Sequence, residues 1–136
     1  MKVASSREAY NYLHKLLTSD VEEFWVTTLR SDKSVIRSTC LFRGTVDNCP
    51  VHPRDIFRFA CMQNASSIIV SHNHPSQDPH PSLEDQRVTR QIVKAGQLLC
   101  IPLLDHIIVT NRGYWSYADR RVYKITNDLF IAAPST

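Results

Sequence analysis

Residues 66–85 read SSIIVSHNHPSQDPHPSLED. The apolar run at the start is short and rich in isoleucine and valine, which predicts a buried strand over residues 66–71. This strand leads directly into His72 and His74, and Pro75 prevents it from continuing. A buried strand that ends in ionisable side chains indicates either a polar turn or a metal site.

The two histidines are one residue apart. Residues i and i+2 of an extended chain point to the same side, so His72 and His74 can direct both imidazole rings toward one point. An H-x-H pair alone is weak evidence for a metal, because many such pairs bind none. Further ligands from another segment are needed to define a site.

A helix is predicted over about residues 83–99, and Asp85 lies in its first turn. The residues that mark its inward face are Val88, Ile92, Ala95 and Leu99. Asp85 falls beside this stripe, whereas Arg87, Arg90 and Lys94 form a basic stripe on the opposite face. An inward carboxylate is costly unless it is paired or bound to a cation, although a helix N-terminus favours negative charge.

Two interpretations of Asp85 remain open. Ser82 and Asp85 form an S-x-x-D variant of the capping box, in which Ser82 is the N-cap. With the histidines, however, the segment reads H-x-H-P-x6-S-x-x-D, and the loop is long enough to return Asp85 to them. Two histidines and an aspartate suit tetrahedral zinc with one open position, where water becomes a nucleophile near neutral pH. Ser82 can then hydrogen-bond this water or the developing oxyanion.

The remaining sequence predicts a mixture of helices and strands. Further helices are expected over residues 5–17, from the capping-box pattern SSRE, and over residues 53–64, from Pro53 onward. Strands are expected at residues 24–29, 35–42, 103–109 and 114–117, where the first two form a hairpin and the last two pair with each other. The chain after Ala118 is expected to form a short helix or to lie irregularly. This mixture predicts an α/β fold in the broad sense.

Length and composition predict one globular domain over residues 1–136. The chain has 136 residues, 43% hydrophobic and 21% charged, with a net charge of +3 that permits but does not demand a nucleic-acid partner. It has no apolar run long enough to span a membrane and no secretory signal, so we expect a cytoplasmic protein. The absence of C-x-x-C argues against a cysteine zinc site, and we expect small buried residues in a reducing compartment rather than catalytic thiols at Cys40, Cys49, Cys61 and Cys100.

The pattern H-x-H-P-x6-S-x-x-D resembles the metal signature of the JAMM (MPN+) metalloproteases. Longer segments resemble the RadC family, a bacterial branch of that superfamily: GTVDNCPVHPRDIF (residues 44–57), SHNHPSQDPHPSLEDQRVTRQI (residues 71–92), AG (residues 95–96) and LLDHIIV (residues 103–109). The similarity covers about residues 21–117, most of the chain. It does not extend to the helix-hairpin-helix region that commonly precedes this domain in the family.

The resemblance implies a JAMM/MPN-like α+β fold, with a mixed, mainly antiparallel central sheet flanked by helices in a cytidine-deaminase-like layout. It implies that His72, His74 and Asp85 hold Zn²⁺ and that Ser82 lies near the catalytic water. The activity implied is that of a zinc-dependent metallohydrolase, a peptidase or isopeptidase acting on a peptide or protein substrate. A homo-oligomer is compatible with this interpretation.

The expected general base is missing from its expected place. Active members of the superfamily use a glutamate from an early strand, and the chain pattern places it about five residues before Gly44, where this sequence has Thr39. Threonine cannot take up a proton at neutral pH, so hydrolysis requires another carboxylate, namely Glu22, Glu23 or Asp55. The sequence also departs from the family at Gln77, where glycine is usual, and at Asp55, where glutamate is usual.

Two other functions are compatible with the sequence. Thr39 favours a catalytically silent, metal-binding interaction module, and the basic stripe with Arg120, Arg121 and Lys124 permits a DNA-repair-associated protein. A stripe of this size is more often a solvated helix face.

Three further features have two interpretations each. His80 is expected to be an exposed loop residue rather than a ligand. Asp105 and His106 either support the site from behind or form an internal hydrogen bond in a half-buried strand. Trp25 and Trp115 are expected to pack in the core or across strands rather than to stack on nucleic-acid bases.

Overall fold

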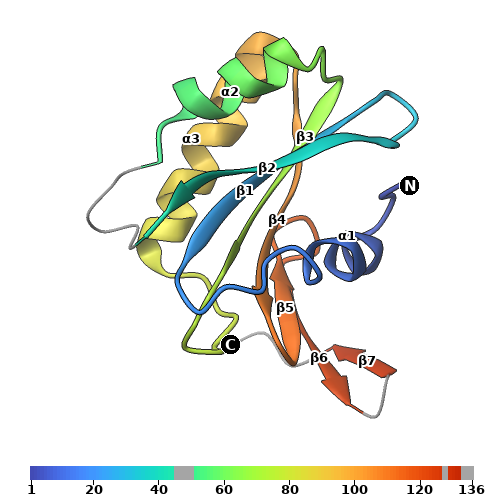
Figure 1. Ribbon diagram of the computed structural model, residues 1–136, viewed down its shortest axis with the longest axis vertical. Helices are drawn as coiled ribbons and strands as arrows, with labels where there is room; N and C mark the ends of the chain where they lie inside the picture. The colour runs from blue at the N-terminus through green and yellow to red at the C-terminus, as the bar shows by residue number, and fades with distance from the viewer. Residues whose placement is uncertain (45–50, 127–128, 133–136) are drawn as a thin grey trace.

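A seven-stranded sheet forms the centre of the part of the chain that the computed structural model describes, which is residues 1–44, 51–126 and 129–132 (Figure 1). Its strand order is β2-β1-β3-β4-β5-β6-β7. The strands are β1 (Glu23–Leu29), β2 (Val35–Arg43), β3 (Ser67–Asn73), β4 (Leu103–Thr110), β5 (Gly113–Ser116), β6 (Arg121–Thr126) and β7 (Leu129–Ala132). All neighbours in this order are antiparallel except β3 and β4, so the predicted mixed, mainly antiparallel sheet is confirmed.

The parallel pair positions the motif. Parallel neighbours require a crossover connection, and α3 (Leu83–Leu99) supplies it between β3 and β4. The strand ends at Asn73 and the loop turns back to Ser82, so the polar end of β3 faces the first turn of α3. β3 is buried along its whole length, which makes it a rigid support for the histidines.

Helices cover both faces of the sheet. Figure 1 shows α2 (Pro53–Met62) and α3 on one face and α1 (Ser6–Leu13) on the other. Each face has its own apolar core. Ile56, Val70 and Ile92 lie in the core under α2 and α3, and Leu13, Ile69 and Ile107 lie in the core under α1. The alternation of Ile69 and Val70 between the two cores follows from the two-residue period of a strand.

Two predictions about element boundaries are wrong. The first helix ends at Leu13 rather than near residue 17, and the chain continues as turns in which the backbone N–H groups of Leu16 and Leu17 both donate to the Leu13 carbonyl. The segment after Ala118 forms β6 and β7 instead of a helix or irregular chain. Pairing of β6 with β5 satisfies its backbone groups, and this partner is not visible in the local sequence.

Burial also corrects two predictions. Cys61 and Cys100 are exposed and Cys40 is partly buried, so the buried interpretation fails for two cysteines, while Cys49 lies outside the described residues. Cys100 is the residue that ends α3, in the left-handed conformation. Leu99, in the last turn of α3, is 46% exposed and does not complete the inward stripe.

No helix in the described segments is long and apolar enough to cross a membrane.

Candidate metal centre

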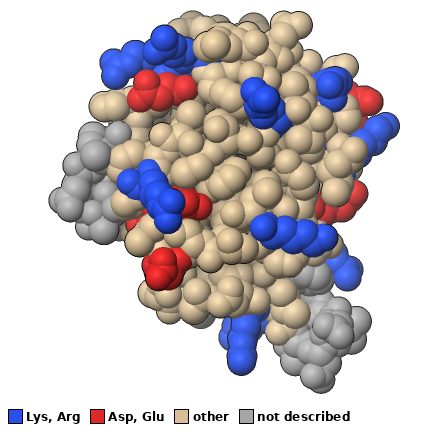
Figure 2. Space-filling model, in the orientation of Figure 1, with Lys and Arg blue, Asp and Glu red and all other residues tan. Residues whose placement is uncertain are grey.

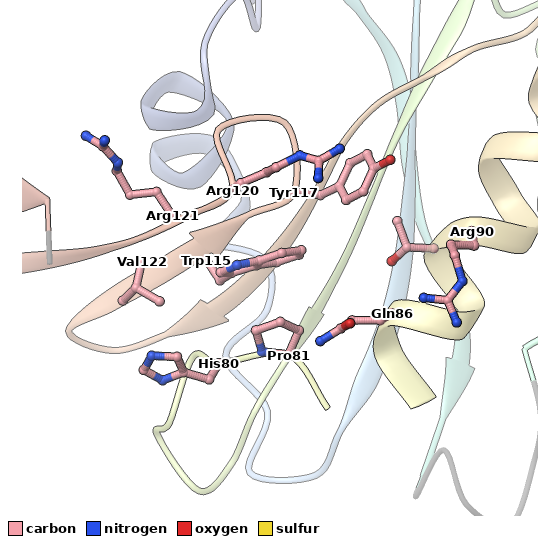
Figure 3. A pocket seen from close by; sticks show the side chains of 10 residues that line it. His80, Pro81, Gln86, Arg90, Trp115, Tyr117, Arg120, Arg121 and Val122 are labelled. Atoms are coloured by element: carbon pink, nitrogen blue, oxygen red, sulfur yellow. The ribbon is translucent and has the colours of Figure 1, made fainter. Parts of the chain in front are cut away.

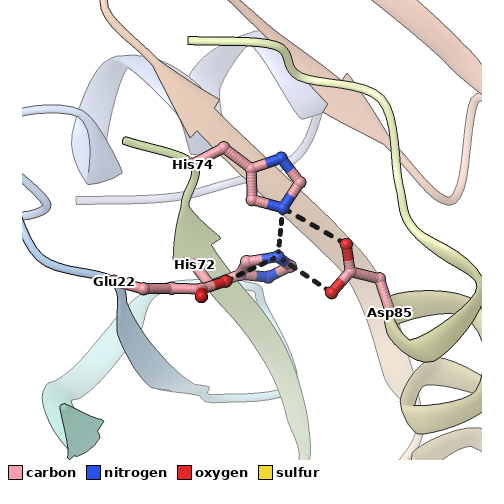
Figure 4. A group of neighbouring side chains, drawn as sticks. All are labelled: Glu22, His72, His74 and Asp85. Carbon is pink, nitrogen blue, oxygen red and sulfur yellow. Dashed lines mark hydrogen bonds and ion pairs between the residues drawn. The ribbon is translucent and has the colours of Figure 1, made fainter. Parts of the chain in front are cut away.

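Four side chains from three segments converge where β3 ends. His72 and His74 come from the end of β3 and the loop after it, Asp85 comes from the first turn of α3, and Glu22 directly precedes β1. One ligand atom from each residue lies within 4.8 Å of the others, and Figure 4 shows the side chains pointing toward one another. This group could hold a metal ion.

The two histidine Nε2 atoms lie 2.9 Å apart. Asp85 bridges them, with Oδ1 at 3.3 Å from His72 Nε2 and Oδ2 at 3.2 Å from His74 Nε2. Glu22 Oε1 lies 3.8 Å from His72 Nε2. His72 and Asp85 are buried, whereas His74 and Glu22 are partly exposed, so the group is open on one side.

A chain of hydrogen bonds through Thr89 and His106 determines which nitrogen of the His72 ring carries the proton. Thr89 Oγ1 donates to the Asp85 carbonyl, so it accepts from His106 Nδ1, 2.6 Å away. Burial, and then the neighbouring His72, lower the pKa of His106 well below its usual range, so its ring is neutral and carries a single proton. The unprotonated His106 Nε2 therefore accepts from His72 Nδ1 at 2.8 Å. As a result, His72 Nε2 presents a lone pair to the centre.

His74 is oriented in the same way. Its Nδ1 lies 2.7 Å from the Asp78 carbonyl and donates to it, so in the neutral ring Nε2 is the acceptor. Burial opposes protonation of this ring, but the neighbouring Asp85 carboxylate raises the pKa of His74, so a proton occupies Nε2 more readily when no metal is bound. Two lone pairs at 2.9 Å repel each other unless a proton or a metal cation lies between them. Burial opposes ionisation of Asp85, but the adjacent His72 and His74 rings and the hydrogen bond from the Ser82 backbone N–H hold its pKa well below the usual range. The centre therefore offers two nitrogen donors and an ionised carboxylate, which is a donor set that fits a divalent metal.

Asp85 fulfils both interpretations that the sequence left open. Its Oδ2 accepts from the Ser82 backbone N–H at 2.9 Å, and Ser82 Oγ accepts from the Asp85 backbone N–H at 3.0 Å. This capping box fixes the carboxylate while both oxygens still face the histidines. Ser82 lies at the start of α3, and its side chain is exposed beside the group.

Glu22 is the carboxylate that reaches the site. Thr39 pairs with Val26 on β1, and β1 separates β2 from β3, so Thr39 lies two strands (about 10 Å) from the histidine strand. Glu23 points elsewhere and contacts Arg43 and Trp25. Asp55 pairs with its neighbour Arg54, away from the group.

The other predicted features have distinct places. His80 is exposed, as expected, and its Nδ1 contacts Asp78 rather than the centre. His106 supports the site, whereas Asp105 accepts hydrogen bonds from Ser116 and the Ala118 backbone, and burial raises its pKa to about 6. Both interpretations of this pair are therefore realised, one by each residue.

The unusual residue at position 77 also has a structural explanation. Gln77 has φ 67°, in the left-handed region that favours glycine. Its side-chain oxygen accepts from the Asn111 backbone N–H at 2.8 Å. This bond ties the motif loop to the turn after β4.

Thr89 is expected to tune metal affinity although it touches no ligand side chain. Thr89→Val removes the acceptor of the His106 proton and frees the orientation of His72, so zinc affinity should fall about 10–100-fold. Thr89→Ser keeps the hydroxyl and should bind as the wild type does. Competition titration with a chromophoric chelator measures both. Equal affinity for Thr89→Val and wild type would show that the chain does not orient His72.

Comparison with known proteins agrees with this geometry. The sequence model of the RadC-like JAB domain matches residues 3–122. A UPF0758 protein of Thermotoga maritima is 42% identical over 118 residues, which cover 87% of this chain and 53% of the relative. A UPF0758 protein of Staphylococcus aureus is 38% identical over 120 residues, 88% of this chain and 55% of the relative. The chain thus spans about half the length of these relatives, and it belongs to the RadC-like JAB domain family.

Proposed function

We propose that this domain is a zinc-dependent hydrolase of peptide or isopeptide bonds. The observation that carries the proposal is the convergence of His72, His74 and Asp85, with both histidine Nε2 lone pairs directed at one point. Tetrahedral zinc with nitrogens at 2.0–2.1 Å requires them to be about 3.3 Å apart, close to the observed 2.9 Å. Two imidazoles and one carboxylate leave one position open, as in catalytic zinc sites.

Zinc in this place would supply a Lewis acid and a water molecule of lowered pKa. Glu22 is suited to the proton transfers of the reaction, because its Oε1 lies beside the ligands and its side chain is partly exposed to substrate. We assign Glu22 Oε1 as the general base that accepts a proton from the water and then donates it to the leaving amine. With this assignment the reaction does not require a glutamate at position 39. The lack of that glutamate was the reason for considering a catalytically silent module.

Ser82 is suited to stabilise the oxyanion. Its oxygen accepts from the Asp85 backbone N–H, so its own proton remains free to be donated, and no acceptor for it is found among the described residues. Ser82 is exposed, and its backbone N–H contacts the Asp85 carboxylate of the group.

Ser82→Gly is expected to separate the two roles of this residue. Glycine replaces a serine N-cap at a cost of only a few tenths of a kcal/mol, but it removes the hydroxyl donor, so kcat should fall about 10²-fold. Ser82→Thr keeps both the cap and the donor and should retain most of the activity. Thermal unfolding and steady-state kinetics measure the two effects. Full turnover in Ser82→Gly would restrict Ser82 to its capping role.

The proposal is tested with zinc-loaded protein and a fluorescence-quenched peptide library that includes branched lysine isopeptides. We expect cleavage that is lost on chelation and restored by one equivalent of zinc. Cleavage that resists chelation, or none with any library member, would contradict the proposed function.

A further inference from the structure

A cavity of about 530 Å³ lies beside the candidate metal centre, between α3 and the β5–β6 hairpin (Figure 3). Its volume is within the range of about 300–1,000 Å³ found for ligand sites. It is lined by His80, Pro81, Gln86, Thr89, Arg90, Trp115, Tyr117, Arg120, Arg121 and Val122. None of these residues is a proposed metal ligand, so the cavity is a separate feature.

The cavity adjoins the centre along the chain and in space. Pro81 directly precedes Ser82, and Gln86 directly follows Asp85. Thr89 lines the cavity and also holds His106 behind His72. A substrate segment in the cavity therefore lies next to the ligands across the first turns of α3.

The lining has three guanidinium groups and no carboxylate. Within the described part of the chain, Arg90, Arg120 and Arg121 form no ion pair. Asp119, the neighbour of Arg120 in the sequence, does not line the cavity, and its carboxylate accepts from Ser6 and Tyr123. The cavity thus has positive charge with no internal counter-charge, and this favours an anionic ligand.

The aromatic wall adds an apolar surface to this charge. Trp115 forms the wall on the hairpin side and contacts His106 edge to face, with centroids 6.3 Å apart. The Arg120 guanidinium lies over the Tyr117 ring, 5.7 Å from its centroid, so one face of that ring is already covered. Trp115 and Val122 are the remaining apolar surfaces against which aliphatic parts of a ligand can pack.

We propose that this cavity binds acidic side chains of a peptide substrate, so that the enzyme prefers acid-rich segments next to the cleaved bond. This inference rests on the proposed hydrolase function. Arginine recognises carboxylates through paired, charge-assisted hydrogen bonds, and the aliphatic stems of glutamate can pack on the apolar wall.

A peptide fits these observations better than a nucleic acid. A polyanion requires a track of unpaired cations, but Arg87, next to Arg90 on the exposed face of α3, is paired with Glu84. On the face shown in Figure 2, basic side chains are separated by uncharged surface and interspersed with acidic ones. Arg90, Arg120 and Arg121, which form no ion pair within the described residues, instead all line one cavity, which suits a compact carboxylate group.

Binding can be measured without turnover in the zinc-loaded full chain carrying Glu22→Gln. The probes are an acetylated peptide amide with three central glutamates, the same peptide with three glutamines, and a short oligothymidylate. By calorimetry we expect the glutamate peptide to bind at least tenfold tighter than the glutamine peptide. Arg90→Ala and Arg120→Ala should each weaken it about tenfold. Arg87→Ala, the matched control on the same helix, should change the affinity less than twofold.

Equal affinity for the two peptides would overturn the inference, as would equal weakening by Arg87→Ala and Arg90→Ala. Tighter binding of oligothymidylate that is lost in Arg90→Ala would overturn it in favour of a nucleic-acid site. The two proposals fail separately. Arg90-dependent binding without cleavage by the wild type refutes only the hydrolase function, whereas cleavage without acidic preference refutes only the cavity assignment.

Discussion

Replacing Glu22 by glutamine is expected to lower kcat/KM for peptide hydrolysis by about 10²–10⁴-fold while zinc stays bound. Glutamine has nearly the same shape as glutamate but cannot take up a proton. Three donors remain for the metal, and Glu22 lies 3.8 Å from His72 Nε2, outside hydrogen-bond distance. The measurements are steady-state kinetics on a cleaved library peptide and zinc stoichiometry by elemental analysis.

Thr39→Glu, added to the Glu22→Gln protein, provides the control for position. Because Thr39 lies two strands from the histidine strand, a carboxylate there should not restore turnover. Two results would contradict the role of Glu22: unchanged kcat/KM in Glu22→Gln, or loss of zinc together with activity. The second result would make Glu22 a ligand rather than the base.

Local patterns in the sequence predict the elements that carry the candidate metal ligands. The isoleucine and valine run before His72 and the apolar spacing around Val88 lie within single elements, so strand β3 and helix α3 follow from nearby residues. The capping box at Ser82 also predicts the start of α3 at Leu83, where the structure has it. The three expected ligands meet because α3 is the crossover from β3 to its parallel neighbour β4, and the loop after β3 brings the start of α3 back to the histidines.

Features that depend on contacts between segments far apart in the sequence cannot be predicted from local patterns. Glu22 was one of three possible carboxylates, and only the placement of β1 beside β3 brings it to His72. Position 39 was a misleading place to expect the base. Its distance along the chain from Gly44 does not show that β1 lies between β2, which carries Thr39, and β3, which carries His72. The support from Thr89 was also missed, since a threonine mid-helix carries no signal until His106 from β4 packs against it.

His74→Ala is expected to lower zinc affinity about 10²-fold. Structural zinc sites have apparent binding free energies of about 10–16 kcal/mol, or about 3 kcal/mol for each of four ligands. His74 is preferable to His72 for this test because it is partly exposed, so its removal leaves no large buried void. His80→Ala is the matched control, since His80 lies in the same loop and contacts Asp78 rather than the centre.

Thermal unfolding gives a second measurement of the His74→Ala effect, independent of activity. Zinc at 1,000 times its dissociation constant stabilises the wild type by about 4 kcal/mol, which corresponds to a rise in Tm on the order of 10 °C for a domain of this size. A 10²-fold loss of affinity leaves only about 1.4 kcal/mol of this at the same zinc concentration, because the ratio falls to about 10. The zinc-dependent rise in Tm should therefore shrink to about a third in His74→Ala and stay unchanged in His80→Ala. An equal rise in both variants would show that zinc binds somewhere other than between His72, His74 and Asp85.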